Sequence, residues 1–238
     1  MSFFDLHLHS AFSGGESSLE QLASTAKQLG YKGICLTEYF KNDDQIKKLQ
    51  AEIEKVKQKV GMDVFLGFEA RSVKELFLLK EKRRKFDVLL VRGGDLRLNR
   101  EACETPEVDI LTHPEYERMD SGLNHVLVNL AAKNNVAIEI NFREMLVSSK
   151  RTRSIILKNM CQNVKLAKKY KAPVIICSGA LSHWDICDPQ CLVSFGTILE
   201  LNLKEAKDCV SKVPEKILKQ VKERRSGDWV APGIKVIK

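Results

Sequence analysis

The segment Asp5-Leu6-His7-Leu8-His9 has the residue types and the spacing of a metal site. Side chains alternate between the two faces of a strand, so a strand here would place Asp5, His7 and His9 on one face. Two imidazoles and a carboxylate on one face can bind a divalent metal such as zinc or manganese. Taken alone, this segment predicts a metal-dependent hydrolase.

The rest of the chain must supply the elements that position these side chains. Short apolar runs rich in Val, Ile, Leu and Phe predict buried parallel strands near 2–8, 33–37, 63–68, 86–91, 108–112, 136–140 and 173–177. Amphipathic stretches predict intervening helices near 18–29, 42–60, 73–84, 121–134 and 151–169. A capping box, Ser17-x-x-Glu20, is expected to begin the first of these helices.

Successive strand–helix units over 238 residues predict an α/β protein with a TIM-like barrel of parallel strands and surrounding helices. Residues 188–225 predict a helical C-terminal region. We expect one domain over residues 1–225 and an appended arm over 226–238, which could be flexible. The carboxyl ends of the strands should then meet at one mouth of the barrel, where function usually resides.

Polar residues follow each predicted strand, and we expect them to ring that mouth. They are His7 and His9, Thr37 to Tyr39, Glu69, Arg92 to Asp95, His113, Glu139 with Asn141, and Ser178 to Ala180.

The composition describes a globular protein, with 44% hydrophobic and 29% charged residues. Neither a signal pattern nor an apolar run of membrane-spanning length occurs, so we expect a cytoplasmic protein with no membrane partner. Seven scattered cysteines without a C-x-x-C pair predict free thiols rather than a disulfide framework.

The net charge of +8 is concentrated in one predicted helix. Residues 150–171 carry eight basic side chains and no acidic one, and the rest of the chain is close to neutral. Arg151, Lys158 and Lys165 recur every seven residues and share a helix face, while apolar residues on another face should pack inward. Such a stripe can neutralise RNA phosphates, although a solvated face without a partner has the same pattern. The predicted RNA-binding residues of this helix are Arg151, Arg153, Lys158, Lys165, Lys168 and Lys169.

Four arginines are expected in loops near the barrel mouth, namely Arg92, Arg97, Arg100 and Arg118. A guanidinium group can bind phosphate in a fork, which makes these residues further RNA-binding candidates. Salt bridges to Asp95, Glu101 or Asp120 are the competing interpretation.

The motifs at the predicted strand ends resemble the polymerase-and-histidinol-phosphatase (PHP) family, whose barrel holds up to three metals. Asp5-Leu6-His7-Leu8-His9 is similar to its D-x-H-x-H, Gly67-Phe68-Glu69 to its G-x-E, and His113-Pro114 to its H-P. Two motifs depart from the family pattern. Thr37-Glu38-Tyr39 stands in place of T-D-H, and Ser178-Gly179-Ala180-Leu181 in place of S-D-A-H.

Those departures remove metal ligands, because glycine and leucine offer no donor atom and the phenol of tyrosine keeps its proton at neutral pH. A single residual divalent metal on His7, His9, Glu69 and His113 remains open, as does a purely structural role for these residues. Efficient metal-dependent phosphoester hydrolysis is not expected, since a multi-metal site needs bridging carboxylates.

A second resemblance covers nearly the whole chain. The sequence is similar to the archaeal ribonuclease P component 3 family, the counterpart of the eukaryotic thirty-kilodalton subunit. The segments that carry the resemblance are 93–95, 99–102, 108–114, 118–125, 130–134, 137–142, 178–180, 205–206 and 210–214. The Ser178-Gly179-Ala180 that breaks the PHP pattern is typical of this family.

The resemblance implies a non-catalytic subunit of a ribonucleoprotein enzyme that removes the 5′ leader of precursor tRNA, with the chemistry carried by RNA. It implies ribonuclease P RNA, protein component 2 and the other protein subunits as partners, and precursor tRNA as an indirect one. We therefore predict no catalytic residue in this chain and no required cofactor. The alternative is a metal-dependent PHP-family phosphoesterase.

Overall fold

The computed structural model describes residues 1–226, 229–231 and 234–235, and its main sheet has seven parallel strands in sequence order. The strands are β1 (Phe3–Leu8), β2 (Tyr31–Glu38), β3 (Asp63–Ala70), β4 (Val88–Arg92), β5 (Ile110–Thr112), β6 (Ala137–Asn141) and β7 (Val174–Cys177). Each predicted strand is present, and neighbours in sequence are neighbours in the sheet.

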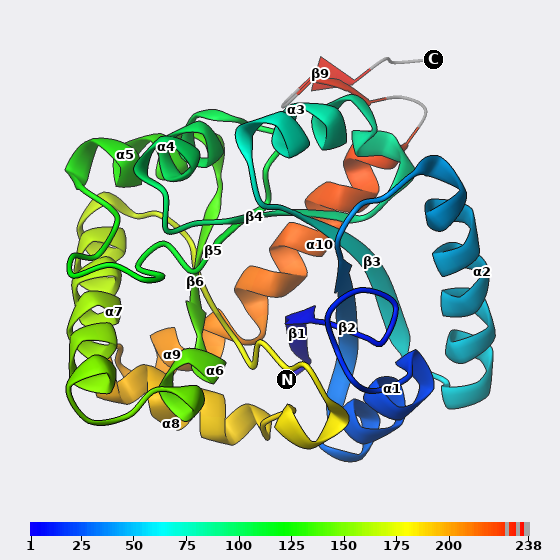
Figure 1. Cartoon of the computed structure of the whole chain (residues 1–238), viewed down its shortest axis with the longest axis horizontal. Helices are drawn as coiled ribbons and strands as arrows, with labels where there is room; N and C mark the ends of the chain where they lie inside the picture. Colours follow the sequence, from blue (N-terminus) through cyan, green and yellow to red (C-terminus); the bar gives the residue numbers. More distant parts are fainter. Residues whose placement is uncertain (227–228, 232–233, 236–238) are drawn as a thin grey trace.

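The sheet curls into a nearly closed barrel, as predicted (Figure 1). Its first and last strands approach each other at Leu8 and Ala180, which form a parallel bridge, and the His9 amide donates to the Ala180 carbonyl over 2.9 Å. The strands are thus held by backbone hydrogen bonds around most of the circumference, with a seam between β1 and β7.

Helices surround the barrel and cover its outer apolar face (Figure 1). They are α1 (Leu19–Gln28), α2 (Asp43–Val60), α3 (Val73–Glu81), α4 (Leu96–Glu104), α5 (His125–Asn134), α6 (Phe142–Val147), α7 (Lys150–Tyr170), α8 (Pro189–Ile198) and α9 (Leu203–Cys209), with short 3-10 turns at Arg83–Lys85 and His183–Asp185. The predicted helical C-terminal region is confirmed as α8, α9 and a final helix, α10 (Lys212–Arg225).

One local prediction about helices was wrong, and two helices were missed. The capping box of α1 is formed by Ser18 and Gln21, one residue later than predicted, because Ser18 adopts the extended backbone of an N-cap. Helices α4 and α6 were not predicted, since both are short, with nine and six residues, and α6 directly continues β6. Their N-caps, Asp95 and Asn141, accept backbone hydrogen bonds from the first turn.

Helix α10 closes the end of the barrel that holds the amino ends of the strands. Ile217, Leu218 and Val221 pack with the side chains at the strand starts in a core cluster of their own. This arrangement fills the lower barrel with apolar side chains, and Figure 1 shows α10 crossing behind the strands. A polar site can therefore lie only at the opposite end of the barrel, where the strands finish.

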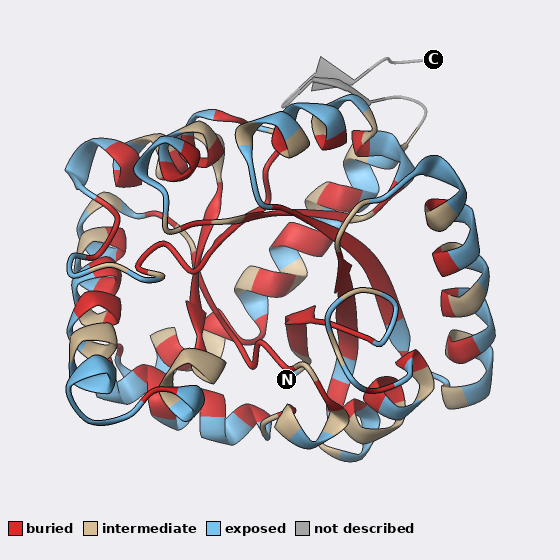
Figure 2. Cartoon of the chain, viewed as in Figure 1, coloured by how far each residue is buried: buried red, intermediate tan, exposed pale blue. Residues whose placement is uncertain are grey.

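Inward-facing side chains change from apolar to polar along each strand. In β3, Phe65 belongs to the lower cluster and Glu69 lies at the upper end, and in β4 the same change occurs between Val88 and Arg92. The strands are buried almost throughout (Figure 2). A buried polar layer therefore lies on top of an apolar plug, at the mouth predicted from the sequence.

The predicted C-terminal arm lies partly outside the described residues. Within it, β8 (Trp229–Ala231) and β9 (Ile234–Lys235) pair in antiparallel fashion. All seven cysteines are free, as predicted. Among the described residues, no helix combines the length and apolarity required to cross a bilayer.

Candidate functional site at the barrel mouth

His7 and His9 converge at the mouth, as their spacing predicts. The two Nε2 atoms lie 3.1 Å apart, and both side chains are buried. On its other side, His7 Nδ1 lies 2.7 Å from Glu139 Oε1. The His7 ring is therefore held at both nitrogens, between a carboxylate of β6 and the second histidine.

The prediction that Asp5 shares their site is wrong. Its Oδ2 accepts a hydrogen bond from the Ser178 amide over 3.1 Å, and its Oδ1 accepts one from the His7 amide. The register of β1 shifts between Asp5 and Leu8, so the simple alternation of side chains fails there. Asp5 instead joins β1 to the end of β7 across the seam, and burial raises its pKa to about 6.

The two histidines have opposite protonation preferences. Burial disfavours the charge on His7, but the carboxylates of Glu139 and Glu69 outweigh burial and raise its pKa to about 9. Burial and the charge of His7 lower the pKa of His9 to about 2. At neutral pH a protonated His7 can then donate to both Glu139 and a neutral His9.

Glu69 extends this cluster toward the rim of the mouth. Its Oε1 accepts a 2.6 Å hydrogen bond from Thr112 and lies 3.8 Å from His7 Nε2. Its Oε2 lies 3.8 Å from the Arg92 guanidinium, too far for a hydrogen bond. Glu69 is therefore a fully buried carboxylate with one oxygen that has no hydrogen-bond donor among the described residues.

His113 forms the other side of the cluster. Its Nδ1 lies 3.1 Å from Glu144 Oε1, and its ring packs against His7 at a centroid distance of 5.4 Å. The Asn141 amide nitrogen lies within 3.4 Å of both His7 Nδ1 and His113 Nε2. The structure thus brings together all four residues predicted to hold a metal, which are His7, His9, Glu69 and His113.

Two overlapping triads have donor atoms within 4.8 Å of one another, and they fit a divalent ion. One consists of His7, His9 and Glu69, and the other of His7, His113 and Glu139. Two imidazoles and one carboxylate form a donor set typical of zinc. The unpartnered oxygens of Glu69 and Glu139 and the unpartnered Nδ1 of His9 agree with this fit.

The residues that depart from the PHP pattern add no ligand. Burial raises the pKa of Tyr39 further, so its phenol stays protonated. Gly179 has a φ of +64°, and a Cβ there would lie 2.3 Å from Asn141 Oδ1. The amide of Asn141 therefore occupies the space that a side chain at position 179 would need.

The mouth arginines are held by neighbouring groups. Arg92 ends β4 and stacks on the Tyr116 ring, with 4.6 Å between its guanidinium carbon and the ring centroid. Two nitrogens of Arg118 donate to Asp120 at 2.7 and 2.8 Å. For this residue the structure therefore shows the salt bridge that was the competing interpretation. Arg97 and Arg100 lie on helix α4 rather than in loops, and Arg100 pairs with Glu104 rather than Glu101.

Helix α7 presents the predicted basic side chains, and its inward face buries Met160, Val164 and Ala167 as expected. Lys165 and Lys168 form ion pairs with Glu200 (2.9 Å) and Glu205 (2.8 Å). The remaining four predicted residues have no ion pair with any acidic side chain in the described part of the chain. They are Arg151, Arg153, Lys158 and Lys169, of which Arg153 donates to the Ser148 carbonyl.

Glu139 and Asn141 were predicted at the mouth but given no role there, and Arg71 was not predicted at the mouth. Glu139 and Asn141 contact His7, and Arg71 stacks on the Tyr39 ring at 4.3 Å. Arg71 follows the strand predicted near 63–68, which is the signal that could have identified it. Their roles depend on which strands face each other across the barrel, and the sequence does not specify that.

Comparison with known proteins identifies the family. Residues 2–226 match the family described as RNase P subunit p30. The chain is 37% identical over 238 residues to a ribonuclease P protein component 3 of Methanosarcina mazei, covering 99% of this chain and 95% of that protein. A chain in a cryo-EM structure of archaeal ribonuclease P with mature tRNA is 29% identical, with a TM-score of 0.80 and 98% coverage of both chains.

A more distant likeness concerns the fold alone. A crystal structure of a Xaa-Pro dipeptidase is 10% identical, with a TM-score of 0.58 over 93% of this chain and 76% of that one. The match along 2–226 and the near full-length relatives decide the assignment, and the chain belongs to the RNase P subunit p30 family.

Proposed function

We infer that this chain is a protein subunit of ribonuclease P that supports RNA-catalysed removal of the 5′ leader from precursor tRNA and is not itself catalytic. The observation that carries this is the family match over residues 2–226. The barrel mouth supports it, because His7, the residue shared by both metal triads, is already engaged by Glu139 and His9.

The mouth is poorly suited to phosphoester hydrolysis. Two-metal hydrolysis needs bridging carboxylates and ligands on both ions. Here both triads share His7, so they cannot hold two ions independently, and Gly179 supplies no ligand. No cofactor is required in our proposal. A single divalent ion, if bound, would be held by His7, His9 and Glu69, where it could polarise an anionic oxygen.

We place the RNA contact on the exposed face of α7. Arg151 and Lys158 are exposed there and have no acidic partner among the described residues, so phosphates can replace water around them. Lys165 and Lys168 must first leave Glu200 and Glu205, which reduces their contribution. Arg92, Arg97, Arg100 and Arg118 are candidates for a second contact near the mouth. Ribonuclease P RNA and protein component 2 are the proposed direct partners.

Reconstitution tests the proposed function. The enzyme is assembled from its RNA and protein subunits with and without this chain, and precursor-tRNA cleavage is followed at low magnesium concentration. We expect cleavage to slow when the chain is omitted. Unchanged cleavage would refute the function, whatever the chain binds.

Paired alanine variants test the RNA surface. Arg151→Ala/Lys158→Ala should weaken RNA binding and reduce the slope of log K against log salt concentration by roughly two, because two phosphate contacts are lost. The matched control is Lys165→Ala/Lys168→Ala, for which we expect a smaller change. Equal effects of the two pairs, or no effect of the first, would contradict this placement.

A further inference from the structure

A pocket next to the barrel mouth is lined by acidic and apolar side chains, whereas the exposed face of α7 is basic. It lies between the first turns of α7, the end of α6 and the loop that follows β5, with a volume of about 380 Å³. Its walls are largely apolar and include Val147, Ile155 and Ile156. Three glutamates also line it, namely Glu115, Glu117 and Glu144. We call it the α7 pocket.

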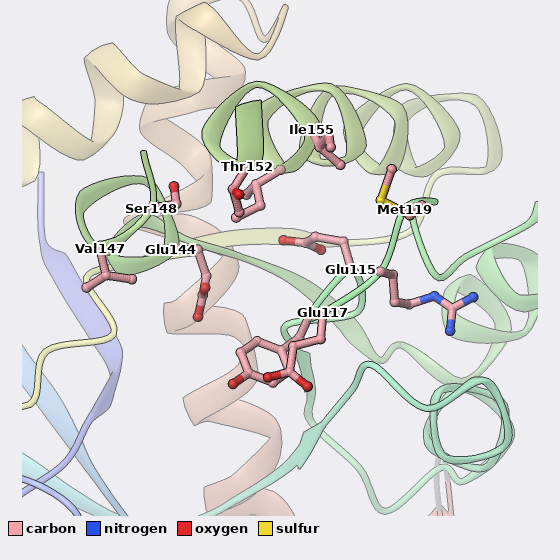
Figure 3. A pocket seen from close by; sticks show the side chains of 11 residues that line it. Glu115, Glu117, Met119, Glu144, Val147, Ser148, Thr152 and Ile155 are labelled. Atoms are coloured by element: carbon pink, nitrogen blue, oxygen red, sulfur yellow. The ribbon is translucent and has the colours of Figure 1, made fainter. Parts of the chain in front are cut away.

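Glu115 is the polar group that marks the α7 pocket as a binding site. Its side chain is 2% exposed and turned toward the pocket, below Thr152 of α7 (Figure 3). One oxygen, Oε2, accepts a hydrogen bond from Asn163 over 3.2 Å. The other oxygen, Oε1, has no hydrogen-bond partner, and neither has the nearby Ser148 hydroxyl. Buried polar groups of this kind are usually satisfied, so a donor from outside the chain is expected.

We propose that the α7 pocket receives a lysine or arginine side chain from another protein subunit of ribonuclease P. A long basic side chain has an apolar stem, which the Ile155 and Ile156 walls would bury, and a donor head group, which Glu115 Oε1 and Ser148 Oγ would bind. The proposal rests on the proposed function, since it presupposes the assembled enzyme.

The charges of the pocket favour a protein over RNA as the occupant. Glu117 and Glu144 line a space that an RNA phosphate would have to approach, and like charges disfavour that contact, while the one basic residue of the lining, Arg118, is paired with Asp120. At the rim, Met119 and Val147 are 73% and 59% exposed, and exposed apolar side chains around a polar centre are typical of protein interfaces. RNA would thus contact the exposed basic face of α7, and the protein subunit would contact the α7 pocket beside it.

Three variants address the pocket by two routes. Glu115→Gln keeps the size of the side chain but removes the group that can ionise beside a bound cation, and Glu115→Asp keeps an ionisable carboxyl group. Thr152→Trp fills the pocket from an exposed position on α7, where folding should tolerate it. The matched controls are Glu16→Gln and Gln28→Trp, at exposed positions outside the pocket.

The experiment measures two affinities for each full-length variant. One is its affinity for the other protein subunits of ribonuclease P, mixed without RNA, and the other is its affinity for ribonuclease P RNA alone. Glu115→Gln and Thr152→Trp should weaken protein binding at least tenfold and leave RNA binding within twofold, while Glu115→Asp and both controls bind like the wild type.

Three outcomes would overturn the proposal. They are wild-type affinity of Thr152→Trp and Glu115→Gln for the protein subunits, a loss confined to RNA binding, and failure of the wild-type chain to bind any protein subunit without RNA. Each is distinct from failure of the proposed function, which is read from precursor-tRNA cleavage when the chain is omitted.

Discussion

The histidines at the barrel mouth are held by one another and by buried acidic side chains. His7 is flanked by Glu139 at 2.7 Å and His9 at 3.1 Å, so a proton on His7 satisfies two buried partners. Asn141 fills the space beside Gly179. The hydrogen bonds of His7 favour one arrangement of side chains, although Glu69, Glu139 and His9 each keep one atom without a partner among the described residues.

The raised pKa of His7 gives stability a defined pH dependence. His7 stays protonated in the folded state to about pH 9, whereas an unfolded histidine loses its proton near pH 6.5. Its stabilising contribution is therefore complete below pH 6.5 and is lost as the pH rises through 9. Glu115 acts in the same direction, since burial raises its pKa to about 8.

We expect the free energy of unfolding to decrease between pH 6.5 and 9, measured by denaturant titration followed by circular dichroism. Glu139→Gln removes the main attraction on the His7 proton and should flatten this decrease. If Glu139→Gln and the wild type lose stability in parallel over this range, the assigned protonation of His7 is wrong.

Gly179 provides a second prediction about a single residue. Gly179→Ala should cost about 2 kcal/mol or more, from the backbone strain of a positive φ and the displacement of Asn141. Gly30→Ala is the control, because its φ of +86° imposes similar strain but nothing lies within 4 Å of the added Cβ. Equal losses of stability for the two variants would show that the contact with Asn141 is unimportant.

At the scale of elements, α10 determines which end of the barrel is available for a site. It contributes Ile217, Leu218 and Val221 to the lower core, and its end is fixed by charge. Asp109 at the start of β5 accepts hydrogen bonds from Arg83 and from Arg224 of α10, each at 2.5 Å. The side chain of Asp109 is almost completely buried, so its charge needs the two arginines beside it, and they need Asp109.

Asp109→Ala should therefore destabilise the chain by about 3–5 kcal/mol, because it leaves two arginines without their shared partner. The exposed pair of Arg100 and Glu104 offers a control, and Glu104→Ala should cost under about 1 kcal/mol. Thermal unfolding of both variants measures the difference. A small effect of Asp109→Ala would mean that this ion triad contributes little to holding α10.

At the scale of the whole molecule, charge is distributed unevenly. The net charge of +8 lies mainly along α7, while the α7 pocket beside it gathers three glutamates. In the proposed function this separation attracts RNA to the basic face of α7 and a basic side chain of a protein subunit to the α7 pocket.

The whole chain should lack phosphoesterase activity of its own. Purified protein with added manganese or zinc should not hydrolyse phosphomonoesters above the rate in buffer, because the mouth lacks ligands for a second independent ion. Hydrolysis that His7→Ala abolishes would instead establish the PHP-type alternative. Hydrolysis that His7→Ala leaves intact would indicate a contaminant.

The local pattern of the chain was sufficient for the order of the strands, the barrel and the convergence of His7, His9, Glu69 and His113, and the resemblance of its motifs indicated the family. Strand periodicity and the polar residues at strand ends are local properties, and a barrel brings all strand ends to one mouth. The α7 stripe was likewise readable from helical spacing, although its ion pairs with Glu200 and Glu205 were not.

Tertiary structure alone decided the rest. The bulge in β1 turned Asp5 away from the histidines, and packing across the barrel made Glu139 the partner of His7. The α7 pocket arises where α6, α7 and the loop after β5 meet. Contacts of this kind join residues far apart in the chain, so no spacing within the sequence encodes them. The D-x-H-x-H segment therefore indicates the fold, whereas the side chains around it determine what it can do.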